Sequence, residues 1–590
     1  AGLDAQHQIA KIASKSGMRI LGPNCLGVFN LRAGWFGTFA NTLASKKIPT
    51  GPIGIVTQSG AYGGHLFTIT QNRGVGTNYW VTTGNEVDID VAEVIEFYAN
   101  EPDIRVIISY AEGIKNGNRM REALEAARNA KKPVIFMKVG STEAGARAAA
   151  SHTASLAGED AIYDGLFKQY GVYRAETTEE MADIAYACQF GRYPNGPKIG
   201  LQTISGGIGV QMADAASKRG FDVAPLPKST QEKIIKLIPF AGVNNPVDFT
   251  GQVLNERRLL EDSMRFVIDE ADYDSQILYL ASLPISEFTK DISLEIFTAL
   301  RKRYPEELMF LSMIGPQESR KPYEEIGYPC FEDHSLAVRA MAALRYFAEV
   351  FKQGKQKVIA SSEVNKLARL EKNISEFEAK SILSAAGIPA NREFLTQSCE
   401  EAIEAQKTID GPVVLKVASP DIPHKTEIGG VLLNLTTKEE VEESYQKLIT
   451  NVHSNAPKAK IDGIIVAEMI TGGIETVLGV TKDPVFGPTV MFGLGGVFVE
   501  VLKDVTFRVA PFGPEEAHRM IDEIKGRAVL DGARGASPAD IDALANAIST
   551  LSIFAAENSD TIQTIDINPF LALPKGAVAV DALIIPSSDK

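Results

Sequence analysis

The sequence predicts a large α/β protein of several domains built on parallel sheets. The first observation is an internal repeat, because "GPIGIVTQSGAYGG" (51–64) and "GPKIGLQTISGGIG" (196–209) share a Gly-Pro pair, a buried strand, a Ser-Gly turn and a helix. The second is that a Gly or Asn turn ending in Asp follows each copy, at 82–88 and 241–248. Strands and helices that alternate in this way favour parallel sheets. The third is the length of 590 residues, which suits roughly three to five domains.

Composition and charge argue against several classes of function. There are 60 Lys and Arg residues against 74 Asp and Glu, so the net charge is −14 and a broad nucleic-acid-binding surface is not expected. No apolar run approaches the roughly 20 residues that span a membrane, and we expect no signal peptide. The four cysteines are widely spaced and show no metal-ligand spacing, so we expect reduced thiols in a cytoplasmic protein.

Five segments follow one another along the chain. The first is expected to hold a helix, an apolar strand in "MRILGP" (18–23) and a loop, like the tail of a nucleotide-binding α/β domain. The two repeats open the second and third segments, and a polar, Lys-containing stretch forms a candidate linker. An amphipathic helix, which Gly387 and Pro389 end, opens the last segment. The predicted boundaries are 1–48, 49–194, 195–352, 353–372 and 373–590.

The Ser-Gly turns of the two repeats carry the first functional signal. Each turn lies between a strand and a helix, where free backbone N–H groups and the helix dipole favour an anion. Two opposed helix ends could clamp one phosphoryl group, although a tight turn that only needs glycine is the alternative for each. The predicted phosphate and acyl site comprises Ser59, Gly60, Asn85, Ser205, Gly206 and Gly207.

His152 is one of only seven histidines in the chain. It lies in "RAAASHTASLAG" (147–158), where almost all of its neighbours are small residues. Small neighbours allow such a segment to move and to enter a confined site, whereas the alternative is an ordinary loop histidine. Glu112 ends the strand in "VIISYAEGI" (106–114). A carboxylate that accepts one ring N–H fixes the imidazole tautomer and leaves the other nitrogen nucleophilic. The alternative for Glu112 is an exposed charge at the end of a strand.

The last segment carries candidate groups for a polyphosphate. Lys416 lies on a predicted strand, and the loop after it holds His424, Gly429 and Gly430. A lysine followed by a Gly-containing loop is what a flap over a polyphosphate requires. Lys416 could instead extend along apolar surface to reach solvent.

Three oxygen-bearing side chains near the C-terminus suggest a cation site. Asp566, Asn568 and Asp581 are expected on neighbouring strands, and hard oxygen ligands are what Mg²⁺ with a bound nucleotide demands. Turn formation is the alternative for "DINP" (566–569). Trp80, in "NYWVTTGN", either shapes an acyl pocket or packs in the core.

Over essentially its whole length the sequence resembles the nucleoside-diphosphate-forming acyl-CoA synthetases, the ADP-forming acetate–CoA ligase branch of the succinyl-CoA synthetase superfamily. "GPNCLGV" (22–28) is similar to the end of the family's CoA-binding domain, and "SHTASLAG" (151–158) is similar to its phosphohistidine motif. The resemblance implies a partial Rossmann-like CoA-binding domain, two flavodoxin-like parallel-sheet ligase domains and a C-terminal ATP-grasp domain. It also implies that most of the family's N-terminal CoA-binding domain is missing, and Ala154 replaces the commoner Gly of the histidine motif.

The resemblance implies a role for each candidate residue. His152 would carry the phosphoryl group, Glu112 would orient it, and His424 would relay phosphate at the nucleotide site. Glu468 would begin the adenine hinge "EMITGG" (468–473). The implied nucleotide-binding residues are Lys416, Gly429, Gly430, Glu468 and Met469, and the implied Mg²⁺ ligands are Asn568, Asp581 and, nearby, Asp566.

The implied reaction is carboxylate + ATP + CoA = acyl-CoA + ADP + phosphate, through an acyl phosphate and a phosphohistidine, in a homodimer with Mg²⁺. Two alternatives are a catalytically degenerate acyl-CoA- or nucleotide-binding regulator and the sensor part of a protein acyltransferase. The regulator loses weight because the candidate catalytic, lysine and metal-ligating residues are all present. The acyltransferase loses weight because such proteins carry an added acetyltransferase domain, and none fits in a chain that ends soon after "VAVDAL" (578–583). Incubation with labelled ATP distinguishes the ligase from both alternatives, since only the ligase forms an acid-labile, base-stable phosphoprotein.

Overall fold

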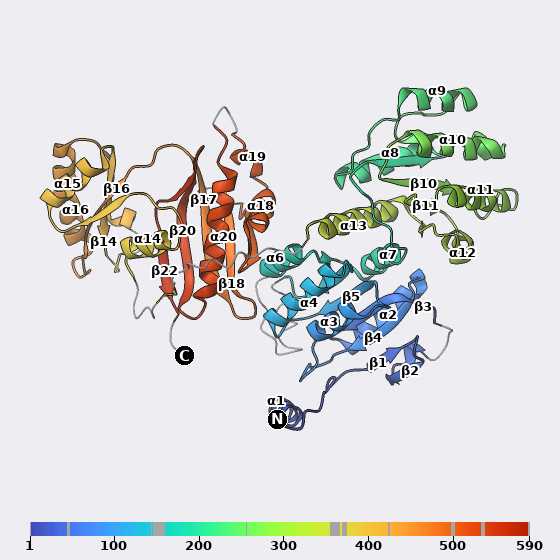
Figure 1. Ribbon diagram of the computed structural model, residues 1–590, viewed down its shortest axis with the longest axis horizontal. Coiled ribbons are helices and arrows are strands. Elements are labelled where there is room, and N and C mark those ends of the chain that lie inside the picture. Colours follow the sequence, from blue (N-terminus) through green and yellow to red (C-terminus); the bar gives the residue numbers. More distant parts are fainter. Residues whose placement is uncertain are drawn as a thin grey trace. The chain divides into compact units, whose positions relative to one another are not determined.

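The computed structural model forms two compact units. Unit 1 consists of residues 1–157 and 170–354, and unit 2 consists of residues 158–169 and 355–590. The helices and strands of both are labelled in Figure 1. The structure describes residues 2–43, 48–142, 144, 160–254, 256–354, 366–367, 374–419, 421–422, 425–496, 502–532 and 537–587.

The first sheet of unit 1 has seven strands in the order β2-β1-β4-β3-β5-β6-β7. From β4 to β7 all neighbours are parallel. Numbered along the chain, these five strands have the order 2-1-3-4-5, which is the flavodoxin arrangement. The strands are β1 (Gly27–Asn30), β2 (Trp35–Thr38), β3 (Thr50–Thr57), β4 (Thr77–Thr82), β5 (Val106–Ala111), β6 (Val134–Lys138) and β7 (Tyr173–Arg174). The helices around them are α2 (Gly60–Arg73), α3 (Val91–Asn100), α4 (Gly117–Asn129) and α7 (Thr178–Cys188).

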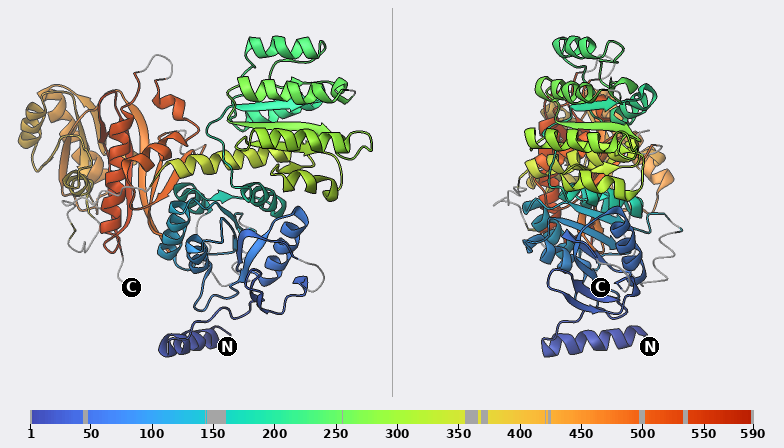
Figure 2. Two further views of the ribbon diagram at one scale, coloured as in Figure 1. Left: turned by 45° about the vertical axis from the view of Figure 1, so that its right-hand side comes forward. Right: turned by 90° about the vertical axis from the view of Figure 1, so that its right-hand side faces the viewer.

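The strand expected in "MRILGP" does not form. Residues 18–23 follow α1 (Gly2–Ser16) without any strand, and their carbonyl groups accept hydrogen bonds from backbone N–H groups of the loop 85–89. A β-strand forms its backbone hydrogen bonds with another extended strand, whereas the segment beside residues 18–23 is the loop 85–89, so no strand forms. The hairpin of β1 and β2 instead extends the first sheet, antiparallel to β4. In both views of Figure 2, α1 (dark blue) lies away from that sheet.

The second sheet of unit 1 has five parallel strands in the order β12-β11-β10-β8-β9. This is again the order 2-1-3-4-5, as the internal repeat predicts. The long helix α13 packs on both α7 and α8. The strands are β8 (Ile199–Thr203), β9 (Val247–Asp248), β10 (Ser275–Ala281), β11 (Met309–Met313) and β12 (Cys330–Phe331). The helices are α8 (Gly206–Lys218), α9 (Lys228–Leu237), α10 (Arg257–Glu270), α11 (Lys290–Arg303), α12 (Gln317–Glu325) and α13 (His334–Lys352).

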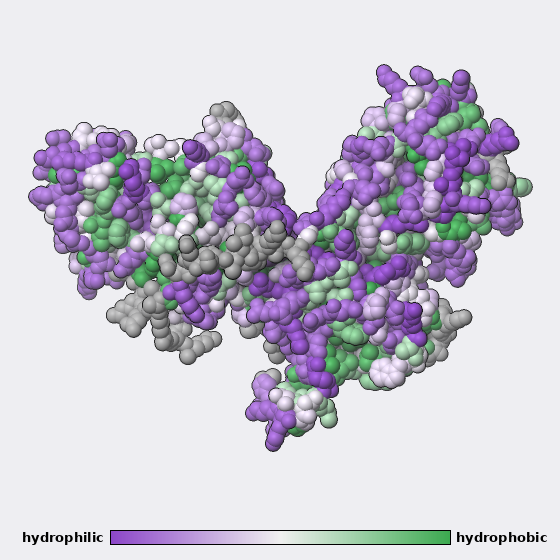
Figure 3. Space-filling view, viewed as in Figure 1, coloured by the Kyte–Doolittle hydropathy of each residue, from purple (hydrophilic) through white to green (hydrophobic). Residues whose placement is uncertain are grey.

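Unit 2 contains two antiparallel sheets. The smaller has the order β13-β16-β14-β15, and α15 and α16 pack on it. These two helices carry the hydrophilic purple surface at the left of Figure 3. The strands are β13 (Glu393–Thr396), β14 (Val413–Ala418), β15 (Val431–Leu435) and β16 (Gly463–Glu468). The helices of this part are α14 (Glu376–Ala385), α15 (Cys399–Ile409) and α16 (Lys438–Asn455).

The larger sheet of unit 2 has the order β19-β18-β17-β20-β21, with β22 also paired to β20. The apolar helix α20 covers it and forms the centre of its core. The strands are β17 (Ile474–Asp483), β18 (Gly487–Leu494), β19 (Val505–Val509), β20 (Ile562–Ala572), β21 (Ala577–Ala579) and β22 (Leu583–Pro586). The remaining helices are α6 (Asp160–Tyr170), α18 (Pro514–Asp522), α19 (Arg527–Leu530) and α20 (Ile541–Glu557). The five-segment boundaries themselves stay a prediction.

Trp80 belongs to the core. Its side chain is fully buried, it stacks on Phe29 with ring centroids 5.3 Å apart, and its indole N–H donates to the carbonyl of Gly63 at 3.0 Å. Of the two interpretations of Trp80, the packing one therefore holds. Among the described helices, none combines the length and the apolar character needed to cross a membrane.

Candidate functional site

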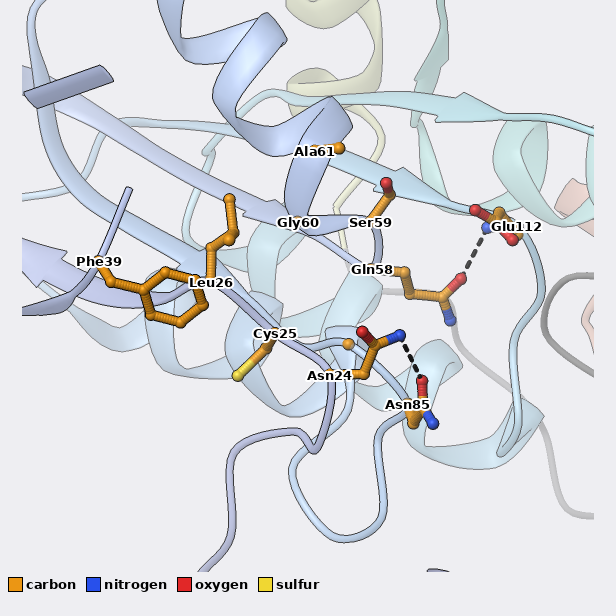
Figure 4. A pocket seen from close by; sticks show the side chains of 11 residues that line it. Asn24, Cys25, Leu26, Phe39, Gln58, Ser59, Gly60, Ala61, Asn85 and Glu112 are labelled. Atoms are coloured by element: carbon orange, nitrogen blue, oxygen red, sulfur yellow. Dashed lines mark hydrogen bonds between the residues drawn. The ribbon is translucent and has the colours of Figure 1, made fainter. Parts of the chain in front are cut away.

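A cavity of about 710 Å³ opens at the N-terminal end of α2. Figure 4 shows Leu26 and Phe39 on one side of the helix end and Gln58 and Glu112 on the other. The lining residues come from the segments before β1 and after β2, from the turn between β3 and α2, from the loop after β4 and from the end of β5. They are Asn24, Cys25, Leu26, Phe39, Gln58, Ser59, Gly60, Ala61, Gly84, Asn85 and Glu112.

The helix end itself is built for close approach. Ser59 is the N-cap, and its hydroxyl accepts a hydrogen bond from the N–H of Tyr62 at 3.3 Å. A Cβ atom on Gly60 would lie 2.8 Å from Cγ of Leu26, so glycine is needed there because the two segments touch. The backbone N–H groups of a first helical turn have no intrahelical partner, and the helix dipole adds positive potential. The end of α2 therefore offers an anion site beside an apolar wall.

Gln58, which lines this cavity, and Glu86 form a buried pair that no sequence motif indicated. The Gln58 amide donates to the Glu86 carboxylate at 2.9 Å and to the Gly113 carbonyl at 2.6 Å. Its oxygen accepts from the N–H of Glu112 at 2.7 Å, drawn in Figure 4. Glu86 is 6% exposed, and burial raises its pKa to about 7, although Gln58 and Thr83 donate to it. Gln58 thus fixes the backbone that carries Glu112.

Glu112 lies at the rim of the cavity, as the hypothesis of an orienting carboxylate requires. It follows directly on β5, and burial together with the nearby Glu112 charge raises the pKa of the Tyr110 phenol. Asn85, on the opposite loop, accepts from the Asn24 side chain at 3.2 Å, and its backbone carbonyl accepts from Lys115. A carboxylate and a helix N-terminus therefore face the same space. His152, the predicted partner of Glu112, lies outside the described residues.

The second predicted helix end does not line this cavity. Ser205 is the N-cap of α8, but its side chain makes no capping hydrogen bond, and Gly206 and Gly207 are exposed. A Cβ atom on Gly206 would lie 3.1 Å from a carboxylate oxygen of Asp248. The structure thus brings Ser59, Gly60, Asn85 and Glu112 together, and the clamp of two opposed helix ends stays a prediction.

A buried cluster of charges in unit 2 surrounds Glu376, at the start of α14. The ammonium of Lys416 lies 2.7 Å and that of Lys380 3.5 Å from the Glu376 carboxylate, and Lys425 contacts it too. Although burial opposes its charge, the three lysines lower the pKa of Glu376 to about 2. Glu376 and Asp581 likewise keep the pKa of Lys416 above its ordinary value against burial. Lys416 is therefore a buried, charged group rather than a lysine that reaches out to solvent.

The predicted Mg²⁺ ligands lie next to this cluster. Asp581 is 3.8 Å from Lys416. Burial, and then the neighbouring charge of Asp581, raises the pKa of Asp566. Asn568 is two residues from Asp566 on β20, so both side chains point to the same face. Two carboxylates that disfavour each other's ionisation and an amide oxygen suit a divalent cation, which would relieve the repulsion. The described residues contain no group of three or more His, Cys, Asp or Glu that could hold a metal.

The predicted adenine hinge begins where β16 ends. The Glu468 N–H donates to the carbonyl of Arg392 at 2.8 Å, and its own carbonyl accepts from the Asn391 amide at 3.0 Å. The Met469 N–H donates to the carbonyl of Pro412 at 2.9 Å. These bonds hold the hinge rigidly against β13 and β14.

The glycines of the predicted flap are packed in place. Gly429 has φ +67°, and a Cβ atom there would lie 2.7 Å from the Asn451 amide, which itself donates to the Gly429 carbonyl at 2.9 Å. A Cβ atom on Gly430 would meet Val417 and the Lys425 carbonyl, both at 2.9 Å. The two glycines are thus required by backbone conformation and close approach. His424 lies outside the described residues.

Comparison with known proteins agrees with this arrangement. Residues 365–585 match the ATP-grasp domain family, and residues 50–188 match the succinyl-CoA ligase like flavodoxin domain family. An ADP-forming acetate–CoA ligase I of Archaeoglobus fulgidus is 33% identical over 98% of this chain and 84% of its own length. An ADP-forming 4-hydroxybutyrate–CoA ligase of Nitrosopumilus maritimus is 34% identical over 98% of this chain and 83% of its own.

A solved structure extends the likeness to the fold. The acetyl-coenzyme A synthetase 1 of Ca. Korarchaeum cryptofilum, in complex with phosphate and ADP, is 29% identical, with a TM-score of 0.53. The match covers 59% of this chain and 75% of that one. The fold and the two sites, with these likenesses, define a ligase of the acid–thiol class. The chain belongs to the ADP-forming acyl-CoA ligase family and is an ADP-forming acyl-CoA synthetase. The regulator and acyltransferase alternatives are not favoured.

Proposed function

We propose that the chain catalyses carboxylate + ATP + CoA = acyl-CoA + ADP + phosphate, with an acyl phosphate and a phosphohistidine at His152 as intermediates. The observation that carries the proposal is that one cavity brings the N-terminal end of α2 and Glu112 together. The acyl phosphate forms in this cavity, and ATP binds at the lysine cluster of unit 2. A phosphohistidine retains the transfer potential of ATP between the two places.

In the α2 cavity the chain supplies positioning and charge stabilisation. Backbone N–H groups around Ser59 and Gly60 bind the phosphoryl oxygens through the helix dipole. Glu112 accepts one ring N–H of His152, which leaves the other ring nitrogen free to attack phosphorus. Gln58 prevents the Glu112 backbone from shifting, because it accepts from the Glu112 N–H and donates to the Gly113 carbonyl.

At the nucleotide site the positive charge is already in place. Glu376 keeps Lys416 charged and lies in contact with Lys425, so the phosphates of ATP would meet ammonium groups that are already positioned. Asp581, Asp566 and Asn568 would hold Mg²⁺, which neutralises phosphate charge when it is bound. The remaining assignments are the hinge at Glu468 and Met469 for adenine, the flap at Gly429 and Gly430, and His424 as the relay to His152.

The first test is labelling with ATP that carries a labelled γ-phosphate. His152→Ala should abolish acyl-CoA formation and the acid-labile label on the peptide that carries residue 152, without changing the melting temperature. Glu112→Gln should slow labelling by about tenfold, because an uncharged amide stabilises an imidazolium less. Acyl-CoA formation from ATP at the parent rate in His152→Ala would contradict the carrier role.

A second test addresses the cation. Asp581→Asn should weaken the binding of ADP with Mg²⁺ by about tenfold in calorimetry, because a charged oxygen ligand is lost. Its affinity for ADP without Mg²⁺ should change little. If the affinity for ADP in the presence of a low concentration of Mg²⁺ is the same in parent and variant, Asp581 has a structural role and does not bind the cation.

We also propose that the enzyme is a homodimer. Light scattering should then give twice the chain mass of 63.7 kDa. The cytoplasmic location stays a prediction.

A further inference from the structure

Another cavity lies against α2, next to the cavity at the end of that helix. Its volume is about 420 Å³, which is within the range of small-molecule sites. Leu26, Phe39 and Ala61 line both cavities, so the two adjoin each other. We call the second cavity the side groove. Its other lining residues are Ala40, Asn41, Gly64, His65 and Thr68.

The side groove follows one face of α2. The helix residues that line it are Ala61 and the residues three, four and seven positions after it, which a helix places on one face. The opposite wall is formed by residues 39–41, which follow β2. The side groove therefore starts beside Gly60, at the anion site of the first cavity, and runs along the helix away from that site.

The part of the side groove near the helix end is apolar. Leu26 is half-buried there, whereas Phe39 is 75% exposed, and both lie on the same side of the helix end in Figure 4. An aromatic ring that is so exposed is stabilised when the carbon chain of a ligand covers it, because apolar surface is then removed from water. This part of the side groove therefore suits an alkyl chain.

Farther along α2 the side groove is polar. The Thr68 hydroxyl donates to the Gly64 carbonyl at 2.9 Å, within the helix itself. The imidazole of His65 packs near the Tyr62 ring, with centroids 6.1 Å apart. Neither His65 nor the Asn41 side chain forms a hydrogen bond with a residue that the structure describes. Both side chains are therefore available to a ligand.

The polar part lies within reach of a short chain that starts at the anion site. His65 is five residues after Gly60, which is about 7.5 Å along the helix axis, and helical side chains lean toward the N-terminus. Four bonds of about 1.5 Å in an extended chain span about 5 Å, and a hydrogen bond adds about 2.8 Å. An oxygen atom four bonds from the reacting carbon can therefore reach His65, whereas the methyl group of acetate cannot.

We propose that the side groove binds the acyl chain of the carboxylate substrate, and that His65 and Asn41 select a chain of about four carbons with a hydroxyl or carbonyl oxygen at its far end. This inference rests on the proposed function, because the side groove leads away from the place assigned to the acyl phosphate. The phosphoryl group lies at the end of α2, the chain covers Phe39, and the distal oxygen accepts or donates a hydrogen bond at His65. His65 and Asn41 determine specificity and take no part in phosphoryl transfer.

The test compares 4-hydroxybutyrate with pentanoate, which has the same chain length but a methyl group in place of the hydroxyl. In the full chain with ATP and CoA, kcat/KM for 4-hydroxybutyrate should exceed kcat/KM for pentanoate by about tenfold, and acetate should be a poorer substrate than 4-hydroxybutyrate. His65→Leu should remove the difference between the first two acids, because leucine fills the place of the ring without offering a hydrogen bond.

Asn72→Leu is the matched control. Asn72 is an exposed polar residue seven positions after His65 on the same helix, and it does not line the side groove. The change also places a leucine on this face of α2, so it reproduces any general effect of an added apolar side chain. The ratio of the two kcat/KM values should stay at the parent value in this variant.

Three kinetic results would overturn the inference. The first is an equal kcat/KM for 4-hydroxybutyrate and pentanoate in the parent. The second is a preference for 4-hydroxybutyrate that persists in His65→Leu. The third is a raised KM for CoA in His65→Leu together with an unchanged ratio between the two acids, because the side groove would then hold the pantetheine arm of CoA.

Calorimetry with two phosphonates separates this inference from the proposed function, because binding needs no catalysis. With the phosphonate group at the end of α2, 4-hydroxybutylphosphonate should bind to the parent about tenfold more tightly than pentylphosphonate, and His65→Leu should remove the difference. If the phosphonates behave in this way but no acyl-CoA forms from any of the three acids, the proposed function alone fails. If acyl-CoA forms but the parent binds both phosphonates equally, the assignment of the side groove alone fails.

Discussion

At the scale of single residues, the α2 cavity depends on the Glu86 carboxyl group, although Glu86 is not among the residues that line the cavity. Glu86 is buried, has a positive φ of 52°, and accepts hydrogen bonds from Thr83, from Gln58 and from the N–H of Val91. These bonds orient the Gln58 amide, and Gln58 in turn fixes the backbone of Glu112. A shift at Glu86 is therefore transmitted to the group proposed to orient His152.

We predict a pH-dependent stability from Glu86. Its folded pKa of about 7 lies above its ordinary value of 4.5, so the folded state binds this proton more tightly. The free energy of unfolding should fall by up to about 3 kcal/mol as pH rises from 4.5 to 7.5, relative to Glu86→Gln, which does not titrate. Urea unfolding of both proteins at several pH values measures this. A difference between parent and variant that is constant with pH would contradict it.

At the scale of elements, the nucleotide site depends on segments that meet from several places. Lys416 comes from β14, Glu376 from the start of α14 and Asp581 from the turn before β22. The segment with Gly429 and Gly430 connects this cluster to α16, since Asn451 of α16 donates to the Gly429 carbonyl. This contact holds Gly429 against α16.

We predict that Gly429→Ala costs about 1–3 kcal/mol of stability and raises the KM for ATP severalfold. Alanine at φ +67° is strained, and its Cβ atom displaces the Asn451 amide. Gly487→Ala is the matched control, because Gly487 has φ +76° but open space around it. It should lose stability through backbone strain alone and keep the parent KM. Equal KM values for ATP in the two variants would show that the contact with Asn451 does not matter for the flap.

At the scale of the whole molecule, the chain is two units with separate cores. The core of unit 1 centres on residues such as Trp80, Ile108 and Phe347, and a core of unit 2 centres on α20. The proposed chemistry is divided in the same way, with the anion cavity in unit 1 and the lysine cluster in unit 2. Among the described helices and strands, α6 comes from the first half of the sequence and clusters with unit 2.

We predict two thermal unfolding transitions, of which ADP with Mg²⁺ raises one. Ligand at 100 times its Kd adds about 2.7 kcal/mol to the unit that binds it, which shifts its Tm by several degrees. Calorimetry with and without ligand measures this, and Asp581→Asn should reduce the shift. Equal shifts of both transitions would mean that unfolding of the two units is coupled.

Local pattern was sufficient for much of this protein. The repeated Gly-Pro, strand and Ser-Gly turn predicted two parallel sheets, and both have the order 2-1-3-4-5. The motifs around His152 and His424 indicated the family, which the relatives confirm. Hydrophobic periodicity and turn-forming residues are properties of residues that are close in the sequence, so they can be recognised without knowledge of the tertiary structure.

Long-range partners were decided only by the tertiary structure. Residues 18–23 have an apolar strand pattern, but a loop lies beside them and no strand forms. Trp80 is a core residue because it stacks on Phe29. Gln58 positions the Glu112 backbone because it forms hydrogen bonds with both Glu86 and Glu112. Whether a polar side chain is buried, paired or shifted in pKa depends on groups tens or hundreds of residues away. The hydrogen-bonded residues Gln169 and Val509 are 340 residues apart, and a sequence pattern does not specify which distant group a side chain will meet.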